Sequence, residues 1–303
     1  MKPLATFIMR GYSQAALVAA VSALLSLLFP LFGLISSASV GLVTLRRGGA
    51  AGALLTLFAT LAVGVFALLA LGSAWPAVGI LVVFWIPVLG LAVVLRRTRS
   101  LDLALQVAGL AGLVLVLTLH LALGDPAVYW QQVLEPMRQA LTDDGLVQSA
   151  SGQALFAEIA RWMTGAFGAA LLLQLLVSLF IARGWQAALY NPGGFGEEFR
   201  SFRMGRASGA LILVLLLVAL SGLGGGLAYT LLPVPAILLL LQGLAVLHRV
   251  HRLMGAHWGW LFGLYLLLVL FMPQLGSLVV CIGLVDIWAD IRSRVERAAV
   301  KSR

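Results

Sequence analysis

Two glutamines are the first candidates for a binding site, because they lie within long apolar stretches. Gln174 is near the middle of one such stretch and Gln242 near the middle of another. An unbonded polar group in apolar surroundings is costly, so each amide is expected to have a partner. Two interpretations remain open, since amides on facing helices bind a polar ligand or simply join the helices to each other.

A second group of candidates combines histidine with carboxylates. His248 and His251 belong to the run His-Arg-Val-His-Arg, while Asp286 and Asp290 are four residues apart and would share one face of a helix. The pattern predicts either a structural cluster of ion pairs or a pH-responsive gate in which histidine is the titrating group. Two histidines three residues apart, without a firm third ligand, do not make a metal site, and we predict none.

Motifs of catalysis are missing from the sequence. There is no HExxH, no GxSxG nucleophile elbow and no GxxxxGK[ST] phosphate loop, and Cys281 is the single cysteine. The glycines that follow Asn191 and Pro192 make a turn outside the strand-to-helix setting of a nucleotide-binding fingerprint. We therefore expect neither enzymatic activity nor a cofactor.

The composition points to a chain that lies in a lipid bilayer. Hydrophobic residues make up 62% of 303 positions, charged residues make up 10%, and the mean hydropathy is +1.06. A soluble domain carries about 25% charged residues. Open sheet edges cannot face lipid, so repeated apolar runs of about 20 residues predict an all-α, polytopic transmembrane helix bundle.

Apolar segments divide the chain into a helical bundle with short connections. We expect ten of them, at 11–29, 31–45, 50–72, 75–95, 101–123, 160–182, 208–230, 234–250, 257–271 and 274–290. The segments 31–45, 257–271 and 274–290 are short for a straight span, so each is either a span or a re-entrant or partly buried helix. The prediction is therefore about 8–10 spanning or re-entrant helices in a single integral membrane domain, 1–303.

The distribution of basic residues predicts the orientation. If the N-terminus lies in the cytoplasm and each segment crosses, every Lys and Arg except Arg138 and Arg161 falls on the cytoplasmic side. This is the positive-inside pattern, with both termini cytoplasmic. It explains the net charge of +9 without nucleic acid as a partner. It also places a basic cytoplasmic tail at 291–303.

The outer-face loop, 124–160, is expected to contain an amphipathic helix over 126–142. Its apolar residues recur at helical spacing, and they are Trp130, Val133, Leu134, Met137 and Leu141. The helix is either a lid over an outward-facing cavity or an element that rests at the lipid interface.

The cytoplasmic loop, 183–207, carries a basic repeat. Glu197 and Glu198 are expected to begin a short helix in which Arg200, Arg203 and Arg206 recur at every third position. These arginines would contact anionic lipid headgroups or dock a cytoplasmic protein partner.

A glycine-rich stretch from Gly222 to Gly226 interrupts the seventh apolar segment. Such a stretch loosens a helix and can break it. In transporters a broken helix is where substrates bind, whereas close helix packing explains the same composition.

Four parts of the sequence resemble one family. They are the inner loop from Ala182 to Phe199, the C-terminal run from Ile282 to Arg292, Pro30 and the Leu-Arg-Arg-Gly run from Leu45. They resemble the YybS-like bacterial membrane proteins, domain of unknown function 2232, over nearly the whole chain. Such a resemblance implies a multi-pass protein of the bacterial cytoplasmic (inner) membrane. That family is distantly similar to the substrate-binding S components of energy-coupling-factor importers, although those have about six spans and are shorter.

S components commonly dock their membrane partner through small residues at four-residue spacing on the first helix. Here Ala15, Ala19 and Ala23 have that spacing, which docking or ordinary internal packing would explain.

Two functions from different classes follow from the sequence. The first is a small-molecule binding or transport protein resembling an S component, with Gln174, Gln242, His248 and Asp286 as candidate ligand contacts. Its alternative is a non-transporting scaffold that docks a cytoplasmic partner through the basic inner loop. A five-plus-five inverted-repeat transporter is a third hypothesis, but no motif recurs between the halves.

Overall fold

Every regular element in the part of the chain that the structure describes is a helix, as predicted from its composition. The structure is a computed structural model that describes residues 2–145, 149–223 and 225–301, without the side chains of 149–151 and 299–301. Residues 302 and 303 of the predicted basic tail lie outside this description. The chain divides into two compact units, residues 1–108 with 173–202 and residues 109–172 with 203–303, which are described one at a time.

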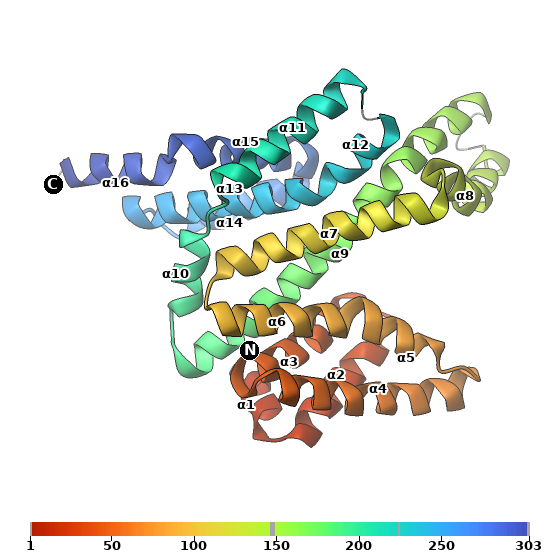
Figure 1. The fold of residues 1–303 in the computed structure, drawn as a ribbon, viewed down its shortest axis with the longest axis horizontal. Coiled ribbons are helices and arrows are strands. Elements are labelled where there is room, and N and C mark those ends of the chain that lie inside the picture. The colour runs from red at the N-terminus through yellow and green to blue at the C-terminus, as the bar shows by residue number, and fades with distance from the viewer. Residues whose placement is uncertain (1, 146–148, 224, 302–303) are drawn as a thin grey trace. The chain divides into compact units, whose positions relative to one another are not determined.

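The first unit is a bundle built around α3 (Figure 1). Its elements are α1 (Lys2–Arg10), α2 (Tyr12–Leu25), α3 (Leu31–Arg47), α4 (Gly49–Leu71), α5 (Trp75–Ile80), the π-helical turn η1 (Leu81–Trp85), α6 (Ile86–Thr98), the start of α7 (Leu101–Leu123), the end of α9 (Ser149–Tyr190) and α10 (Gly194–Ser201). Helices α1, α2, α4 and α6 all pack against α3. The short segment predicted at 31–45 is therefore a helix largely enclosed by protein.

Small and hydroxylated residues allow α2, α3 and η1 to pack closely. Ser36 Oγ donates a hydrogen bond of 2.7 Å to the carbonyl oxygen of Ala19 and accepts one of 2.9 Å from Trp85 Nε1. Ser36 and Trp85 are both buried. The chain of hydrogen bonds gives a buried indole a partner, which removes the cost of burying its N–H group.

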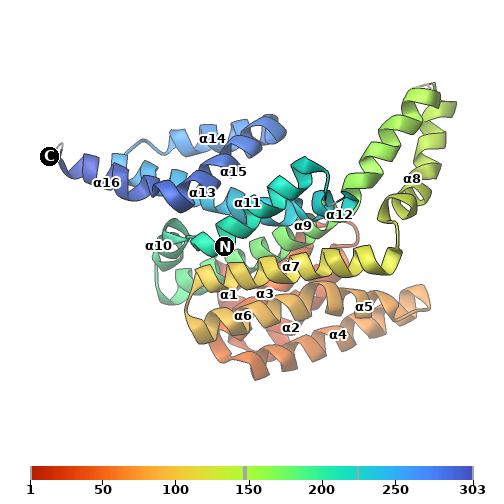
Figure 2. The same ribbon diagram turned by 45° about the horizontal axis from the view of Figure 1, so that its top comes forward.

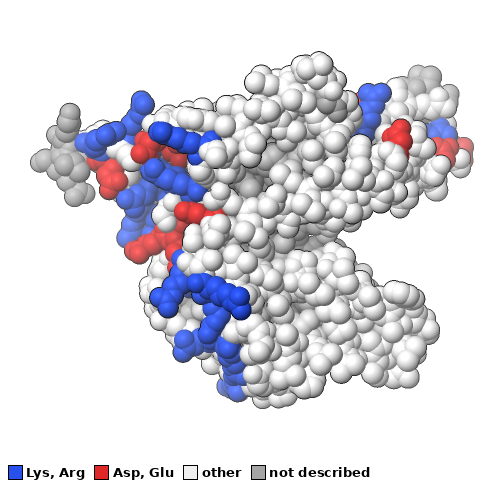
Figure 3. Space-filling view, viewed as in Figure 1, with Lys and Arg blue, Asp and Glu red and all other residues white. Residues whose placement is uncertain are grey.

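Charged residues of the first unit gather at one end of its helices (Figure 3). No Asp, Glu, Lys or Arg occurs in residues 11–45 or 48–95, which form the bodies of α2, α3, α4, α5 and most of α6. The basic groups follow these apolar bodies, as expected at a membrane surface.

The second unit holds the remaining helices (Figure 2). They are the later part of α7, α8 (Pro126–Asp143), the first part of α9, α11 (Arg206–Ser221), α12 (Gly225–Leu231), α13 (Pro233–Met254), α14 (Gly259–Leu270), α15 (Met272–Ala289) and α16 (Ile291–Lys301). Helices α13 and α15 form its most extensive helix pair.

Two glycines permit the close crossing of α13 and α15. A Cβ atom on Gly243 would lie 2.0 Å from the carbonyl oxygen of Val279, and one on Gly283 would lie 2.1 Å from the carbonyl oxygen of Leu239. Both distances are far inside van der Waals contact. Any side chain at either position would therefore push the two backbones apart.

Among the described residues, six helices are long and apolar enough to cross a membrane, or seven if the pair α10 and α11, bent by 55°, is one span. Helices α2 and α14 are apolar but shorter. Large apolar side chains on the spans are exposed, such as Leu69 at 82% and Leu211 at 71%. Because water would disfavour such surfaces, they are expected to face lipid. The chain is a multi-pass membrane protein.

The predicted boundary between the segments 208–230 and 234–250 is wrong. The break falls earlier, after Ser221, and α12 instead precedes α13 in one apolar stretch, Gly225–Met254. Gly222, with φ of 74°, ends α11 in the left-handed conformation that glycine adopts without strain. The glycine-rich stretch therefore does interrupt a helix.

Candidate functional site

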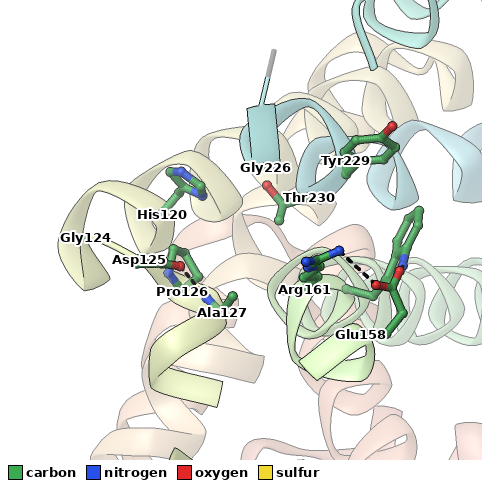
Figure 4. Close-up of a pocket in the computed structure, with 11 residues that line it drawn as sticks. His120, Gly124, Asp125, Pro126, Ala127, Glu158, Arg161, Gly226, Tyr229 and Thr230 are labelled. Carbon is green, nitrogen blue, oxygen red and sulfur yellow. Dashed lines mark hydrogen bonds and ion pairs between the residues drawn. The ribbon is translucent and has the colours of Figure 1, made fainter. Parts of the chain in front are cut away.

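A cleft of about 610 Å³ lies in the second unit, where four helices meet (Figure 4). Its wall comes from the end of α7, the first turn of α8, α9 and the short helix α12. In Figure 4, His120 and Asp125 lie on one side of it and Glu158 and Arg161 on the other, with Thr230 between them. The cleft therefore brings together residues that are far apart in the sequence.

The break between α11 and α12 opens next to this cleft. Gly226 lines the cleft, and a Cβ atom on Gly222, Gly225 or Gly226 would meet nothing within 4 Å. Close helix packing therefore does not explain these three glycines. Instead they free α12 to turn away from α11 and to place Tyr229 and Thr230 on the cleft.

Charged and aromatic groups of α9 form one side of the cleft. Arg161 Nη1 and Trp162 Nε1 each donate a hydrogen bond of 3.1 Å to the carboxylate of Glu158. The indole of Trp162 and the ring of Tyr229 are 5.8 Å apart in an edge-to-face arrangement. Arg161 and Glu158 remain 70% and 58% exposed, so both stay accessible to a ligand from solution.

His120 supplies a polar atom on the opposite side. Its Nδ1 is buried, and no residue in the described part of the chain forms a hydrogen bond with it. A buried ring nitrogen normally has a partner, so this atom is an unsatisfied hydrogen-bonding group beside the cleft. The side chain can donate or accept there, depending on its tautomer.

Close backbone packing fixes the floor of the cleft. A Cβ atom on Gly165 would lie 2.4 Å from the carbonyl oxygen of Thr230, and one on Gly168 would lie 2.3 Å from Val116 Cγ2. Helix α9 is thus held directly against α12 and α7. A side chain at either glycine would push these helices apart and displace the residues that line the cleft.

The amphipathic helix predicted over 126–142 is α8, Pro126–Asp143. Asp125 caps it by accepting a hydrogen bond of 2.9 Å from the backbone N–H of Ala127. Trp130 Nε1 donates a hydrogen bond of 2.8 Å to Thr164 Oγ1 and so joins α8 to α9. Further along, hydrogen bonds from Arg138 and Gln139 lower the pKa of Glu135 to about 2. Helix α8 therefore packs on α9, and its first turn borders the cleft.

The predicted ligand contacts Gln242 and Asp286 are together, but away from the cleft. Gln242 is wholly buried, accepts a hydrogen bond of 2.8 Å from the backbone N–H of Met204 and donates one of 3.2 Å to Asp286 Oδ2. Both ends of its amide are thus used in joining segments of the second unit, which fits the helix-joining interpretation. Gln174 belongs to the first unit. Its Nε2 would lie 3.5 Å from a Cβ atom on Gly33.

Asp286 and Asp290 do form ion pairs, but with arginines outside the predicted run from His248 to Arg252. Asp286 binds Arg292 at 2.7 Å, and Asp290 binds Arg203 at 2.5 Å. His248 instead contacts the carbonyl oxygen of Leu244 at 2.8 Å and Tyr265 Oη at 3.3 Å. The carboxylates do not share a helix face as expected, because Asp290 ends α15 with φ of 45° and turns the chain.

Neither predicted docking surface is a single exposed face. Ala15, Ala19 and Ala23 are buried within the first unit, where α2 packs on α3 and α4, as ordinary internal packing requires. The predicted helix with three arginines ends at Ser201, so it carries Arg200 alone. Arg203 follows it in the link to α11 and binds Asp290, while Arg206 begins α11.

Acidification is expected to release the Arg203–Asp290 pair. Hydrogen bonds from Ser293 and Arg203 lower the pKa of Asp290 from 3.8 to about 2. The pair therefore stabilises the fold above pH 3.8, and this contribution is lost as the pH falls through 2. Thermal unfolding of Asp290→Asn should show a deficit of less than about 1 kcal/mol at pH 6, since the pair is exposed. The deficit should shrink as the pH falls from 3.8 towards 2 and should disappear below pH 2, and a deficit that persists below pH 2 would contradict the assignment.

Sequence reasoning did not select Glu158, Arg161, Trp162 or Tyr229. Arg161 carried a signal, since it is one of two basic residues that the positive-inside pattern leaves outside. The glycine-rich stretch was a second signal, and it was correctly associated with a broken helix. Sequence alone could not show that the two features meet.

Comparison with models of protein families, with curated proteins and with solved structures finds no match for this chain. Among the described residues, no three His, Cys, Asp or Glu side chains gather as metal ligands would. The site must therefore be interpreted from its own geometry.

Proposed function

We propose that the protein is a multi-pass membrane protein that binds a small molecule in the cleft beside the α11–α12 break. The observation that carries this proposal is the break itself, since Gly226 lines the cleft and a Cβ atom on Gly222, Gly225 or Gly226 would meet no atom within 4 Å. Membrane transporters use interrupted helices to place polar groups against a substrate. A cleft with a few convergent polar groups and aromatic rings is the usual form of a small-molecule site.

The lining residues favour a ligand with a flat ring and an acidic or carbonyl group. Trp162 and Tyr229 offer ring faces and edges for such a body. Arg161 would exchange part of its hydrogen bonding with Glu158 for the polar group of the ligand. On the other side, Nδ1 of His120 would gain the partner that it lacks within the described chain.

The cleft lies at the end of an apolar span. Helix α7 ends at Leu123, and the next residue, Gly124, lines the cleft. It would therefore be reached from one membrane surface. The positive-inside distribution makes this the outer surface, with both termini in the cytoplasm. We also propose that the protein belongs to the YybS-like family, which it resembles, and that it is more distantly similar to S components. This membership would place the protein in a bacterial inner membrane.

Filling the cleft is expected to abolish ligand binding without unfolding the protein. Gly226→Leu would project a side chain into open space at the cleft. Mass spectrometry of detergent-purified protein should detect a small molecule with the wild type and at least about tenfold less with this variant, a loss of about 1.4 kcal/mol. Gly263→Leu in α14 is the matched control, since its Cβ position is also open. It should retain the molecule.

The proposal fails if wild-type protein carries no small molecule and no compound from a metabolite library raises its melting temperature. It also fails if Gly226→Leu and the control lose the molecule equally. Trp162→Ala provides a second variant, and it should weaken binding by removal of a ring face.

The scaffold alternative has less support. Its basic repeat is divided among three structural elements, and Arg203 is already bound to Asp290. Loss of a cross-linked cytoplasmic protein from Arg206→Ala, with the fold intact, would favour the scaffold over ligand binding.

A further inference from the structure

A basic pocket in the first unit, separate from the cleft, lies at the ends of its apolar helices. It has a volume of about 400 Å³, and residues of α3, α6, α9 and α10 line it together with Arg99, which follows α6. The charged lining residues are Arg96, Arg99, Arg183 and Glu198. The pocket therefore has an excess of positive charge.

Helix ends hold two of these arginines in place. Arg96 Nη1 donates hydrogen bonds to the last carbonyl oxygens of α3, including one of 2.9 Å to Arg46. Arg183 Nε donates one of 2.9 Å to Glu198 Oε2 and so connects α9 to α10. Because both guanidinium groups are anchored, the pocket keeps its shape without a ligand.

Arg99 differs from these two because, within the described chain, its side chain has neither an ion pair nor a hydrogen bond. Like Arg96, it is exposed. With φ of 53° it ends α6 in the left-handed conformation, which turns the chain at the rim of the pocket. Its guanidinium group is consequently available to an anion from outside the protein.

The position of the pocket at the end of the apolar helix bodies indicates which anion would bind there. Buried Leu45 and Leu95 line the pocket and belong to helices that carry no charged residue until their last turns. The arginines thus mark the edge of the hydrocarbon layer, which is where the phosphates of phospholipids lie. Basic pockets between spanning helices at this level bind anionic headgroups. A phospholipid presents its phosphate at this level of the membrane, whereas a free phosphate ion must be captured from water.

We propose that Arg96 and Arg99 bind the phosphate group of an anionic phospholipid in this pocket, while Arg183, held by Glu198, forms part of its wall. The lipid would be held on the arginine-rich side of the membrane, and its phosphate would receive hydrogen bonds from Arg99. Such a contact with a phosphate is strong because both groups are charged. This site is independent of ligand binding in the cleft.

Native mass spectrometry of the delipidated protein tests the proposal. Phosphatidylglycerol should bind with higher affinity than phosphatidylcholine, and Arg99→Gln should weaken phosphatidylglycerol binding about fivefold, the effect of one arginine near an anionic surface. Arg97→Gln is the matched control, because Arg97 is exposed on α6 but does not line the pocket. It should change the affinity less than twofold, and both variants should melt as the wild type does.

Three outcomes would overturn the proposal. Equal losses from Arg97→Gln and Arg99→Gln would mean diffuse attraction by a basic surface rather than a pocket. Equal binding of phosphatidylcholine and phosphatidylglycerol would mean that the charge of the lipid is not recognised. Competition by inorganic phosphate at millimolar concentration would identify a site for a free anion instead of a lipid.

Discussion

Asp286→Ala is expected to destabilise the second unit by about 3–5 kcal/mol, because it would remove the carboxylate that binds the buried guanidinium group of Arg292. The side chains of this pair are only 1% and 4% exposed, and Asp286 also accepts a hydrogen bond from Gln242. Unfolding of the purified protein by a denaturing detergent, followed by circular dichroism, would measure the loss. Removing one partner of a buried ion pair costs far more than the net value of most surface ion pairs.

Asp290→Asn provides the matched control, since it removes a carboxylate charge only four residues away whose ion pair is 42–46% exposed, and asparagine tolerates the left-handed backbone at this position. It should cost less than about 1 kcal/mol. The double replacement Asp286→Leu with Arg292→Met should recover much of the stability that Asp286→Ala loses, because it removes both charges. Similar losses from Asp286→Ala and Asp290→Asn would show that the buried pair does not hold the unit together.

Gly243→Val is expected to prevent the close crossing of α13 and α15. Its Cβ atom would lie 2.0 Å from the carbonyl oxygen of Val279, which belongs to the backbone and cannot move by a change of rotamer. Overpacking costs typically 1–3 kcal/mol even where side chains can adjust, so we expect a loss of at least about 3 kcal/mol here. Thermal unfolding and the yield of monodisperse protein would measure it.

Gly263→Ala in α14 is the control for this variant, because no atom lies within 4 Å of its Cβ position. It should leave stability unchanged or slightly increased, as alanine favours helix. A second change, Val279→Ala, should not rescue Gly243→Val, since the clash is with the backbone. Rescue would indicate that α13 and α15 are separated by side chains alone.

Predictions from the sequence were most successful where they depended on one helix at a time. The α8 helix lies where the spacing from Trp130 to Leu141 placed it, and the glycine-rich stretch after Ser221 ends a helix. Local rules are sufficient for such features, because a hydrophobic period or a glycine acts on its own neighbours.

Predictions of pairing were less successful. Asp286 was expected to meet the histidines of α13, yet it binds Arg292, six residues further along the chain. The turn at Asp290 brings Arg292 back toward the end of α15, and no periodicity in the sequence encodes that turn. Likewise, the spacing of Ala15, Ala19 and Ala23 identifies a small-residue face but not which helix covers it.

The amino-acid sequence alone determined that this protein lies in a lipid bilayer, that it is helical, and where its basic residues fall along the chain. These properties are sums over residues, since hydropathy and charge act at each position. The tertiary structure alone decided that His120, Arg161 and Tyr229 border one cleft and that Arg99 stands at the rim of another pocket. Each site joins helices that are distant in sequence, and the way that helices pack depends on their shapes as a whole.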